Sequence, residues 1–405
     1  MNIRLFYFVA DAFPAWRSDV IELFGRELPR RGLEVAWSMR RSKAGRCSQV
    51  QQENQTVYLP ASIGKGSSPA KIASRLLEAL YEAPRFLDLV LRNRVDIVQV
   101  RDDRYLAALW AWMAARLTGA RYVYWLSFPF PEHDAESAKL AKGPRRAFLT
   151  FRAQLTGWWL YRVQLRLADH VFVQSESMAD DIAAYGVARR RMTAVPMGVP
   201  MGLIEWAASH RRVVQPGLVI YIGTLAASRR LTTVIEAFAI VTQTQPAARL
   251  LMVGEGDRPG EREALEQLAR RLGIADRVTF TGFLPMEKVW ELAAGAAVGL
   301  SPFFPDRVLR VASPTKLVEY MALGCPAICN DHPEQSAIIG QSGAGLCVPW
   351  GAENFAAAIC RLLDNPESAE HMGARGPAWV TARRTYRIIA DEVWRQYLRI
   401  AGLES

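Results

Sequence analysis

The chain has 405 residues, of which half are apolar, and it carries a formal net charge of +10. This length and composition allow two hydrophobic cores of ordinary size, so we expect two domains. No run approaches about 18 uncharged apolar residues, which excludes a membrane-spanning helix. The five cysteines form no CxxC pair, which argues for reduced core cysteines in a cytoplasmic protein.

The first half of the chain alternates short apolar runs with longer helical patterns. Residues 1–13 lack a cleavage site of small residues, and Asp11 interrupts their apolar run, so they predict a strand rather than a signal peptide. We expect strands at 3–9, 95–100, 122–126 and 171–174, and helices at 19–31, 70–92, 104–117 and 147–167. Strands flanked by helices predict a parallel sheet that is covered on both faces.

The excess positive charge lies in this first half. Residues 1–200 hold 29 Lys and Arg against 19 Asp and Glu, whereas residues 201–405 hold 21 of each. Residues 139–166 carry seven cations and no acid, interleaved with Phe148, Phe151, Trp158, Trp159 and Tyr161. A basic, aromatic-rich helix suits an anionic membrane surface. A solvated helix face with buried tryptophans is the alternative; nucleic acid is not expected as a partner, because no recognised binding module accompanies the charge.

The second half repeats the alternation after the turn-rich segment MTAVPMGVP at 192–200 and a linker at 201–216. We expect strands at 218–222, 250–253, 278–281 and 298–300, and helices at 231–242, 261–272 and 286–293. The predicted division is therefore a first domain at 1–200, a second doubly wound domain at 217–382, and a terminal segment at 383–405, with a helix at 383–400 that is able to pack back on the first domain. Two such sheets bind ligands at the carboxyl ends of their strands, in the cleft that they share.

The segment SPTKLVEYMALGCPAICN at 313–330 is the most informative motif. Ser313 suits an N-cap and Pro314 the first helical position, so Thr315 and Lys316 place a hydroxyl and a cation at a helix N-terminus, where anions bind. Glu319 follows one turn later on the same side of the helix. This pattern fits a nucleoside diphosphate, with phosphates at the helix start and a ribose at the carboxylate. An ordinary capped helix with a solvated Glu is the alternative.

An ordered series of segments resembles the GT-B glycosyltransferases, specifically the retaining enzymes of family 4, over roughly residues 3–380. ADHVFVQSE at 168–176 resembles the strand that ends the first domain, and VPMGV at 195–199 the interdomain signature. YIGTLAASRRL at 221–231 resembles the glycine loop with its following basic residue. LMVGEGD at 251–257 and RVTFTGFLP at 277–285 resemble the next strand ends, and the motif at 313–328 resembles the phosphate and ribose helix.

The resemblance assigns roles to individual residues. It implies that Glu319 holds the ribose, and that Arg229, Lys316 and Thr315 meet the diphosphate. The remaining donor-side residues that it implies are Gly223, Arg230, Gly254, Gly282, Phe283 and Ser313, with Gly282 and Phe283 at the base edge. Within this set, surface arginines at a helix start and simple tight turns are the alternative interpretations.

The sequence also departs from the family pattern. Val311 stands where the first Glu of the EX7E motif is expected, and that Glu is associated with the donor sugar. The glycine loop of the first domain is replaced by residues 14–18, and the expected histidine is missing from WLSFPFPEH at 125–133. The acceptor-side candidates are therefore Arg17, Ser18, Ser127, Glu132 and His133.

The resemblance implies a retaining glycosyltransferase that moves a sugar from a nucleotide-sugar donor to a glycan acceptor. With the basic stretch 139–166, it leads us to expect a polyprenyl-diphosphate-linked or other lipid-linked acceptor, exopolysaccharide or cell-surface glycan synthesis, and a peripheral place at the inner face of the cell membrane. No metal or other cofactor is expected, because Asp102-Asp103 and Asp180-Asp181 suit helix starts better than a metal site. A nucleotide-sugar epimerase or hydrolase and a catalytically silent membrane adaptor are the alternatives.

Overall fold

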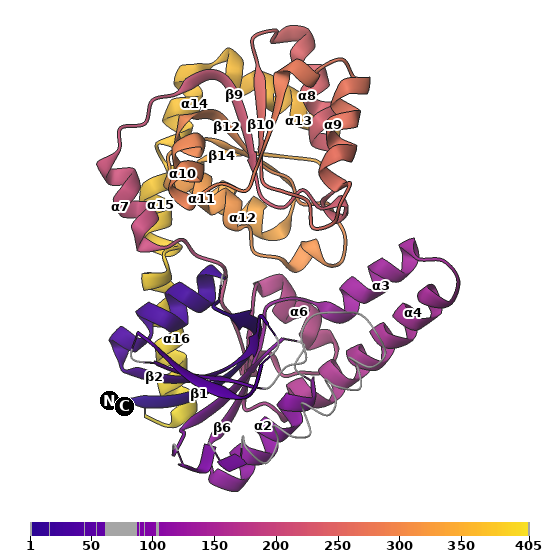
Figure 1. Cartoon of the computed structure of the whole chain (residues 1–405). Coiled ribbons are helices and arrows are strands. Elements are labelled where there is room, and N and C mark those ends of the chain that lie inside the picture. The colour runs from indigo at the N-terminus through magenta and orange to yellow at the C-terminus, as the bar shows by residue number, and fades with distance from the viewer. Residues whose placement is uncertain are drawn as a thin grey trace. The chain divides into compact units, whose positions relative to one another are not determined.

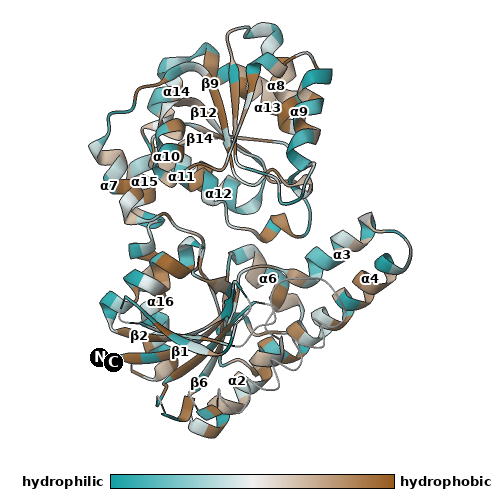
Figure 2. Ribbon diagram, in the orientation of Figure 1, coloured by the Kyte–Doolittle hydropathy of each residue, from teal (hydrophilic) through white to brown (hydrophobic). Residues whose placement is uncertain are grey.

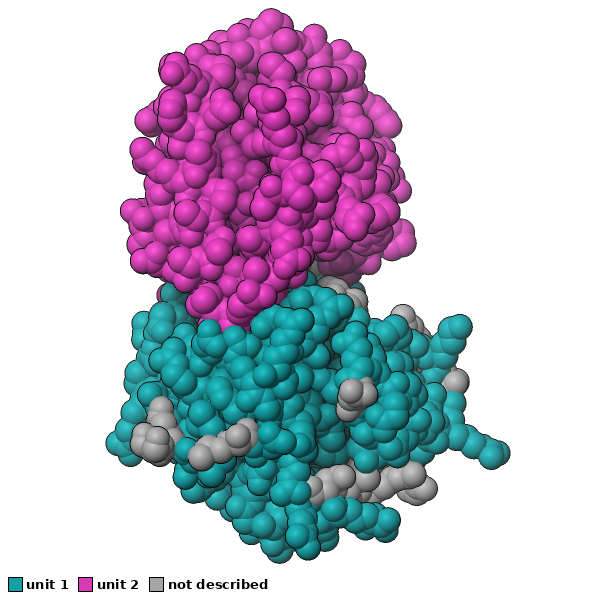
Figure 3. Space-filling model, turned by 90° about the vertical axis from the view of Figure 1, so that its left-hand side faces the viewer, with its two compact units in different colours: residues 1–196, 389–405 teal, residues 197–388 magenta. Residues whose placement is uncertain are grey.

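A computed structural model describes residues 2–403 except 16, 44, 54, 61–86, 89, 93, 103 and 104. The predicted helix at 70–92 therefore lies largely outside the described residues, and Asp103 lies wholly outside them. The chain divides into two compact units, shown in two colours in Figure 3: unit 1 comprises residues 1–196 and 389–405, and unit 2 comprises residues 197–388. Both are doubly wound α/β units, as predicted.

Unit 1 is built on an eight-stranded sheet of order β3-β4-β2-β1-β5-β6-β7-β8, of which Figure 1 labels β1, β2 and β6. Its strands are β1 (Ile3–Phe13), β2 (Leu33–Arg41), β3 (Ser48–Gln52), β4 (Gln55–Leu59), β5 (Ile97–Arg101), β6 (Arg121–Leu126), β7 (His170–Val173) and β8 (Met192–Ala194). The apolar runs of β1, β5 and β6 are almost entirely buried, as central strands covered on both faces must be. The all-parallel prediction is wrong at one edge, where β3 pairs antiparallel with β4. The polar sequence of β3, Ser-Gln-Val-Gln-Gln, carries little strand signal.

The helical segments of unit 1 are more numerous than the sequence indicates. They are η1 (Asp19–Glu27), η2 (Pro29–Arg31), α2 (Tyr105–Thr118), α3 (Phe130–Leu140), α4 (Gly143–Gly157), η3 (Trp158–Gln164), α5 (Leu165–Leu167), α6 (Glu176–Ala184) and η4 (Arg189–Arg191). The predicted helix at 147–167 is in fact α4, η3 and α5 in succession. It is preceded by the unpredicted α3, with which α4 forms a helical hairpin that extends away from the sheet (Figure 1).

Unit 2 is built on a six-stranded parallel sheet of order β11-β10-β9-β12-β13-β14. Its strands are β9 (Gln215–Ile222), β10 (Arg249–Val253), β11 (Val278–Gly282), β12 (Ala296–Ser301), β13 (Ala327–Asn330) and β14 (Gly345–Val348). Alternate residues of β9 serve two cores, because successive side chains of a strand point to opposite faces. Val219 and Tyr221 pack in one core, and Leu218 and Ile220 in the other.

Helices cover both faces of this sheet. One core is closed by α8 (Thr232–Thr244), α9 (Glu261–Arg271) and α13 (Ala352–Asp364), and the other by α7 (Met201–Ser209), α10 (Met286–Gly295), α11 (Thr315–Ala322), α12 (Pro333–Ser342) and α15 (Gly376–Arg383). The short elements η5 (Ala227–Arg229), η6 (Ala275–Arg277), η7 (Leu309–Val311) and α14 (Pro366–Gly373) complete the unit. The predicted linker at 201–216 contains α7, whose Leu203 is fully buried in the second core, and the start of β9.

The last helix, α16 (Tyr386–Ala401), returns the chain to unit 1. Tyr397 donates a hydrogen bond of 2.6 Å from its buried hydroxyl to Oε1 of Gln99 on β5. Asp391 pairs with Arg31 at 2.7 Å. Unit 1 therefore consists of two separate stretches of the chain, and its fold includes residues 389–405.

Candidate functional site

The carboxyl ends of β9, β10 and β11 carry the glycines that the sequence singles out, and parallel pairing brings these ends to one edge of the unit 2 sheet. Gly223 follows β9 with φ +138°, and its N–H donates to the Val253 carbonyl at 2.9 Å. Gly254 follows β10 with φ +139°, and its N–H donates to the Gly282 carbonyl at 3.1 Å. The three strand ends thus form one continuous backbone surface.

Close packing accounts for two of these glycines. A Cβ at Gly254 would overlap the carbonyl oxygen of Gly223, and a Cβ at Gly223 would lie 2.5 Å from Cε of Lys316. Both residues also adopt backbone conformations that L side chains rarely take. The glycine at 223 therefore leaves the space through which the Lys316 side chain reaches the strand ends.

Lys316 lies in the first turn of α11, half-buried, with Nζ 5.5 Å from the ring centroids of both Tyr221 and Phe303. Burial, and then the charge of Arg229, hold the pKa of Lys316 well below its usual value. Of the residues that the structure describes, none offers a carboxylate within ion-pair distance of this ammonium group. A cation in this position gains stability when an anion approaches it.

Arg229 ends η5, one loop after Gly223, with its side chain half-buried. Burial raises the pKa of Tyr221 to about 12, and the charge of Arg229 opposes this rise. The same charge contributes to the lowered pKa of Lys316, so the guanidinium lies near both side chains. The neighbouring Arg230 is exposed, adopts φ +52°, and holds its guanidinium 5.4 Å from the ring of Phe304. The structure therefore groups Arg229 with Lys316 and directs Arg230 to a different contact.

Glu319 follows Lys316 by three residues on α11 and is also half-buried. Burial raises the pKa of Glu319 from 4.5 to about 7, against the opposing charge of Lys316. Within the described ranges its carboxylate has no hydrogen-bond or ion-pair partner. The adjacent Tyr320 anchors the helix, because its buried hydroxyl accepts a hydrogen bond of 2.9 Å from the N–H of Ile222 and its ring fills the space that Gly299 leaves. Sequence reasoning did not identify Tyr320 as part of the site.

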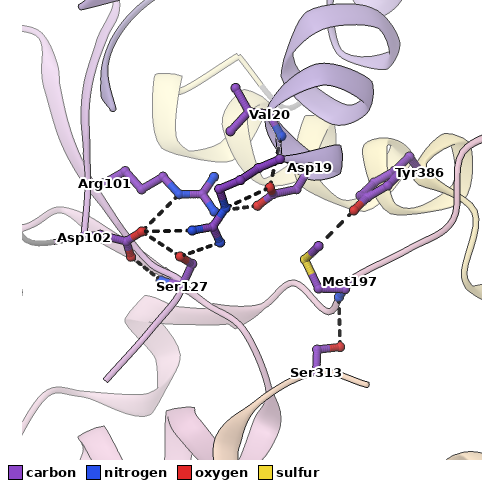
Figure 4. Close-up of polar contacts among 9 residues, drawn as sticks. Asp19, Val20, Arg101, Asp102, Ser127, Met197, Ser313 and Tyr386 are labelled. Atoms are coloured by element: carbon purple, nitrogen blue, oxygen red, sulfur yellow. Dashed lines mark hydrogen bonds and ion pairs between the residues drawn. The ribbon is translucent and has the colours of Figure 1, made fainter. Parts of the chain in front are cut away.

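Ser313 has a different structural role from the predicted one. The N-cap position belongs to Pro314, and no side chain caps α11. The Ser313 hydroxyl instead accepts from the N–H of Met197 at 2.9 Å (Figure 4) and donates to Glu334 at 3.0 Å. Glu334 also pairs with Arg384 at 2.7 Å. Thr315 is the first residue of α11 and is half-buried.

The remaining donor-side positions lie beside this edge. Gly282 ends β11 with φ +71°, and the next residue, Phe283, leaves 81% of its side chain exposed. Val311 is buried in η7, so its position, eight residues before Glu319, presents an apolar group to the core instead of a carboxylate to the site.

On unit 1, the structure joins two of the five acceptor-side candidates. Nη2 of Arg17 donates at 3.1 Å to Oγ of Ser127, which follows the carboxyl end of β6. Ser18 precedes η1 without capping it. Glu132 accepts a hydrogen bond of 2.7 Å from the Tyr161 hydroxyl, and His133 is exposed with its ring 5.5 Å from that of Phe128.

A buried charge network that the sequence did not predict supports the Arg17–Ser127 contact. Asp102 accepts from both the N–H and the hydroxyl of Ser127, each at 2.7 Å, and from Arg101 at 3.2 Å. Arg101 also binds Asp19 at 2.6 Å (Figure 4). Burial is the largest single influence on the pKa of Asp19 and raises it, but the charges of Arg101 and Arg17, together with hydrogen bonds from Arg101 and the N–H of Val20, lower that pKa overall. The prediction that Asp102 serves a helix start is therefore wrong: it is a buried residue with φ +57° at a strand end.

Comparison with known proteins gives matches to both units. The family model described as "Glycosyltransferase Family 4" matches residues 19–202, and the one described as "Glycosyl transferases group 1" matches residues 204–379. An alpha-D-kanosaminyltransferase of Streptomyces kanamyceticus is 27% identical over 45% of this chain and 46% of its own length. A GDP-mannose-dependent alpha-(1-6)-phosphatidylinositol monomannoside mannosyltransferase of Mycobacterium tuberculosis is 26% identical over 65% of this chain and 75% of its own length.

Solved structures resemble the whole chain. Sucrose-phosphate synthase of Thermosynechococcus elongatus aligns with a TM-score of 0.73 and 18% identity over all of both chains. Anabaena HepE, in complex with UDP and glucose, aligns with a TM-score of 0.68 and 15% identity over 98% of this chain and 99% of its own. These structures share the two-unit fold, whereas the chain spans about half the length of the first curated relatives that it matches.

Proposed function

We propose that this chain, which belongs to the group 1 glycosyltransferases of GT-B fold, transfers a sugar from a nucleotide-sugar donor to a glycan acceptor with retention of configuration. One observation carries this proposal: two cations, Arg229 and Lys316, lie at the carboxyl edge of the unit 2 sheet, followed one helical turn later by the unpartnered carboxylate of Glu319. This arrangement matches an anionic diphosphate followed by a ribose diol.

The donor site can be assigned in this order. Arg229, Lys316 and the N-terminus of α11 would face the diphosphate, Glu319 would accept from the ribose hydroxyls, and Gly282 with Phe283 would border the base. The glycines at 223 and 254 keep the strand ends free of side chains, so that a ligand can approach the backbone. Similar structures that contain UDP or UDP-glucose support a nucleotide-sugar donor.

The chemistry follows from the charge of the leaving group. The bond between the anomeric carbon and the diphosphate oxygen breaks, the acceptor oxygen bonds to the same face of that carbon, and the acceptor proton passes to the leaving diphosphate. Stabilisation of the developing negative charge by Arg229, Lys316 and the helix N-terminus would be the main catalytic contribution. These groups supply positive charge at the phosphates, so no metal or other cofactor is included in the proposal.

The acceptor is proposed to be a lipid-linked glycan in exopolysaccharide or other cell-surface glycan synthesis. The Mycobacterium tuberculosis relative, named for a phosphatidylinositol mannoside acceptor, supports this class. Arg17, which the buried Ser127 and Asp102 hold in place, offers a guanidinium for acceptor recognition on unit 1. Within the described part of the chain, every helix is too short or too polar to cross a lipid bilayer. The basic, aromatic-rich residues 139–166 support a further proposal, peripheral attachment at the inner face of the cell membrane.

An epimerase, a hydrolase or a silent adaptor is less well supported, because the matched family models and curated relatives are transferases. The adaptor alternative rests on Val311, which stands in place of a carboxylate. An adaptor would bind nucleotide without transferring sugar, so a transfer assay distinguishes it from the enzyme.

A thermal-shift panel of UDP-, GDP- and ADP-sugars tests the donor site, because a ligand that binds only the folded state raises its stability. Arg229→Ala should weaken the binding of whichever sugar nucleotide stabilises the wild type about 10- to 100-fold. This is the loss expected when a hydrogen bond to a charged group is removed. Arg249→Ala, an exposed arginine at the opposite end of β10, is the matched control and should bind as wild type. Unchanged affinity in Arg229→Ala would refute the assignment.

Transfer assays test the chemistry. Sugar transfer should continue in excess EDTA, and Lys316→Ala should reduce the transfer rate more than it weakens binding of the nucleoside alone. A strict requirement for magnesium or manganese, combined with near wild-type transfer by Lys316→Ala, would show that the phosphates lie elsewhere.

A further inference from the structure

The α3–α4 hairpin of unit 1 presents an apolar face that its own packing does not use. Three residues of α4 and the first residue of η3, which continues it, form what is here called the α4 stripe. Phe148, Phe151, Leu155 and Trp158 are 53%, 62%, 52% and 57% exposed. Their spacing of three or four residues places them on one side of the helix. The buried residues Leu149 and Ala153, which close the hairpin, lie roughly on the opposite side. Figure 2 shows the resulting mixture of hydrophobic and hydrophilic residues along α4.

The cations around this stripe differ in their availability. Lys139 pairs with Glu136 at 2.7 Å within α3, whereas Arg152 of α4 binds Asp134 of α3 through Nε at 2.7 Å and so links the two helices of the hairpin. Arg166 donates to the carbonyl of Tyr185. Four others are exposed and have no hydrogen-bond or ion-pair partner among the described residues: Lys142, Arg145, Arg146 and Arg162.

The acidic residues of the hairpin are all engaged internally. Glu132 accepts from Tyr161, and Asp134 and Glu136 hold the two cations just described. Residues 130–166 contain seven Lys and Arg against three Asp and Glu, a net charge of +4. The exposed apolar stripe therefore belongs to a hairpin whose excess positive charge has no counterpart within it.

This charge decides between the possible occupants. A second copy of the chain would bring identical cations together across the interface, which opposes self-association. An anionic lipid surface satisfies both features, because its headgroups neutralise the cations and its acyl boundary accepts the apolar side chains. A tryptophan and two phenylalanines are well suited to that boundary.

We propose that the α4 stripe inserts into the surface of an anionic membrane while Lys142, Arg145, Arg146 and Arg162 contact the lipid phosphates. The inference rests on the proposed peripheral attachment and adds an apolar contact that salt does not screen. Of the seven cations in residues 139–166, it assigns the lipid contacts to the four that have no partner among the described residues. It does not depend on the transfer chemistry of unit 2.

The experiment uses the full chain and vesicles of phosphatidylcholine, with or without about 30% phosphatidylglycerol. The wild type should sediment with the anionic vesicles, and Trp158 should move to an apolar environment, seen as a blue shift that Trp158→Phe removes. The variant Phe148→Ser/Phe151→Ser/Leu155→Ser should lose binding at both low and high salt. The matched control is Leu117→Ser, which removes a side chain that is 69% exposed at the end of α2.

The charge is tested separately. Lys142→Gln/Arg145→Gln/Arg146→Gln should weaken binding at low salt about 100-fold, since each cation contributes about 1 kcal/mol near an anionic surface. Arg152 is left intact because it holds the hairpin. Arg270→Gln/Arg271→Gln on the solvent face of α9 is the charge control and should bind as wild type.

Three results would overturn the proposal: vesicle binding by the stripe variant equal to wild type, equal binding to neutral and anionic vesicles, or self-association in lipid-free solution that the stripe substitutions abolish. Far-UV circular dichroism and the melting temperature verify that the variants fold. The donor-induced thermal shift should be the same in all of them. If no donor raises the melting temperature of the wild type although it binds the vesicles, the transferase assignment is refuted and the membrane contact is still supported.

Discussion

At the scale of single residues, the candidate donor site contains two ionisable groups whose pKa values differ from their ordinary values. Burial raises the pKa of Glu319 to about 7 and lowers that of Lys316, because each charged form loses hydration at the sheet edge. A bound sugar nucleotide would compensate both groups, with phosphate charge beside Lys316 and hydroxyl donors at Glu319. The ionised forms that binding requires are thus partly suppressed in the free protein.

The first prediction concerns the pH dependence of donor binding. The carboxylate of Glu319 must be ionised to accept from a ribose diol, so affinity should rise as pH increases towards about 7 and then level off. Below that pKa it should fall up to about tenfold per pH unit. An intact nucleotide-sugar is the ligand to use in calorimetric titrations, because it has no terminal phosphate to titrate. Glu319→Gln should bind more weakly and lose this pH dependence; an unchanged profile in the variant would exclude Glu319 as its origin.

Stability should change with pH in the opposite direction. The folded pKa of Glu319 lies above its unfolded value, so its contribution to stability is full below about 4.5 and is lost as pH rises through about 7. Glu319→Gln should therefore be more stable than wild type at pH 8, in the absence of donor, and should gain less between pH 8 and pH 5. Melting temperatures across this range provide the measurement.

Residue roles were predictable where local spacing decides them. Lys316 and Glu319 share a side of one helix, and that follows from three-residue spacing alone. The role of Ser313 did not follow, because the N–H that claims its hydroxyl belongs to Met197, 116 residues away in sequence. Asp102 was misjudged for the same reason: its partners Ser127 and Arg17 come from other strand ends.

At the scale of elements, the strand-end loops of unit 2 must be free of side chains for two different reasons. At Gly223 the conflicting atom is Cε of Lys316, near the end of a flexible chain, whereas at Gly254 it is a backbone carbonyl. A side chain can move aside, but the backbone of a packed loop cannot do so without distorting the sheet edge.

The second prediction separates these cases. Both changes place a side chain at a positive φ, and each should cost about 1–3 kcal/mol of stability for this reason alone. Gly223→Ala should also displace Lys316 and weaken donor binding about tenfold or more, whereas Gly254→Ala adds a clash with a backbone carbonyl and should destabilise unit 2 clearly more than Gly223→Ala does. Gly340→Ala in α12 is the control, because its Cβ meets nothing and a helical Gly→Ala change stabilises by about 0.5–1 kcal/mol. Denaturant unfolding and donor titration of the three variants measure the two effects. Equal losses of stability at 223 and 254 would contradict this account.

Elements with a strong apolar pattern were predicted well, and polar ones were missed. The core strands β1, β5, β6 and β9 to β12 appear where their apolar runs indicate. The hairpin of β3 and β4 rests on glutamine-rich sequence, and α3 begins at Phe130 in a segment where the sequence predicted no helix. Only packing against the neighbouring strand or helix distinguishes these segments from loops.

At the scale of the whole molecule, unit 1 depends on a segment that follows unit 2 in the sequence. Helix α16 places Tyr397 against Phe172 and Gln99, both in central strands of unit 1. The sequence predicted a terminal helix, but the identity of its buried partners depends on tertiary packing. The proposed donor site and the completion of unit 1 thus involve different parts of the chain, and their effects on stability should be separable.

The last prediction tests this separation through the buried Tyr397–Gln99 hydrogen bond. Tyr397→Phe removes the donor and leaves Oε1 of Gln99 buried without it, which should cost about 1–3 kcal/mol. For a unit of this size that corresponds to a melting temperature lower by about 2–12 °C. Gln99→Leu/Tyr397→Phe should recover most of the loss, because two apolar groups leave no unsatisfied oxygen, and the double-mutant cycle then isolates the bond. The donor-induced stabilisation should be unchanged throughout, since the proposed donor site lies within unit 2. A Tyr397→Phe variant with wild-type stability, or one whose donor response falls in parallel with its melting temperature, would show that α16 does not stabilise unit 1 in this way.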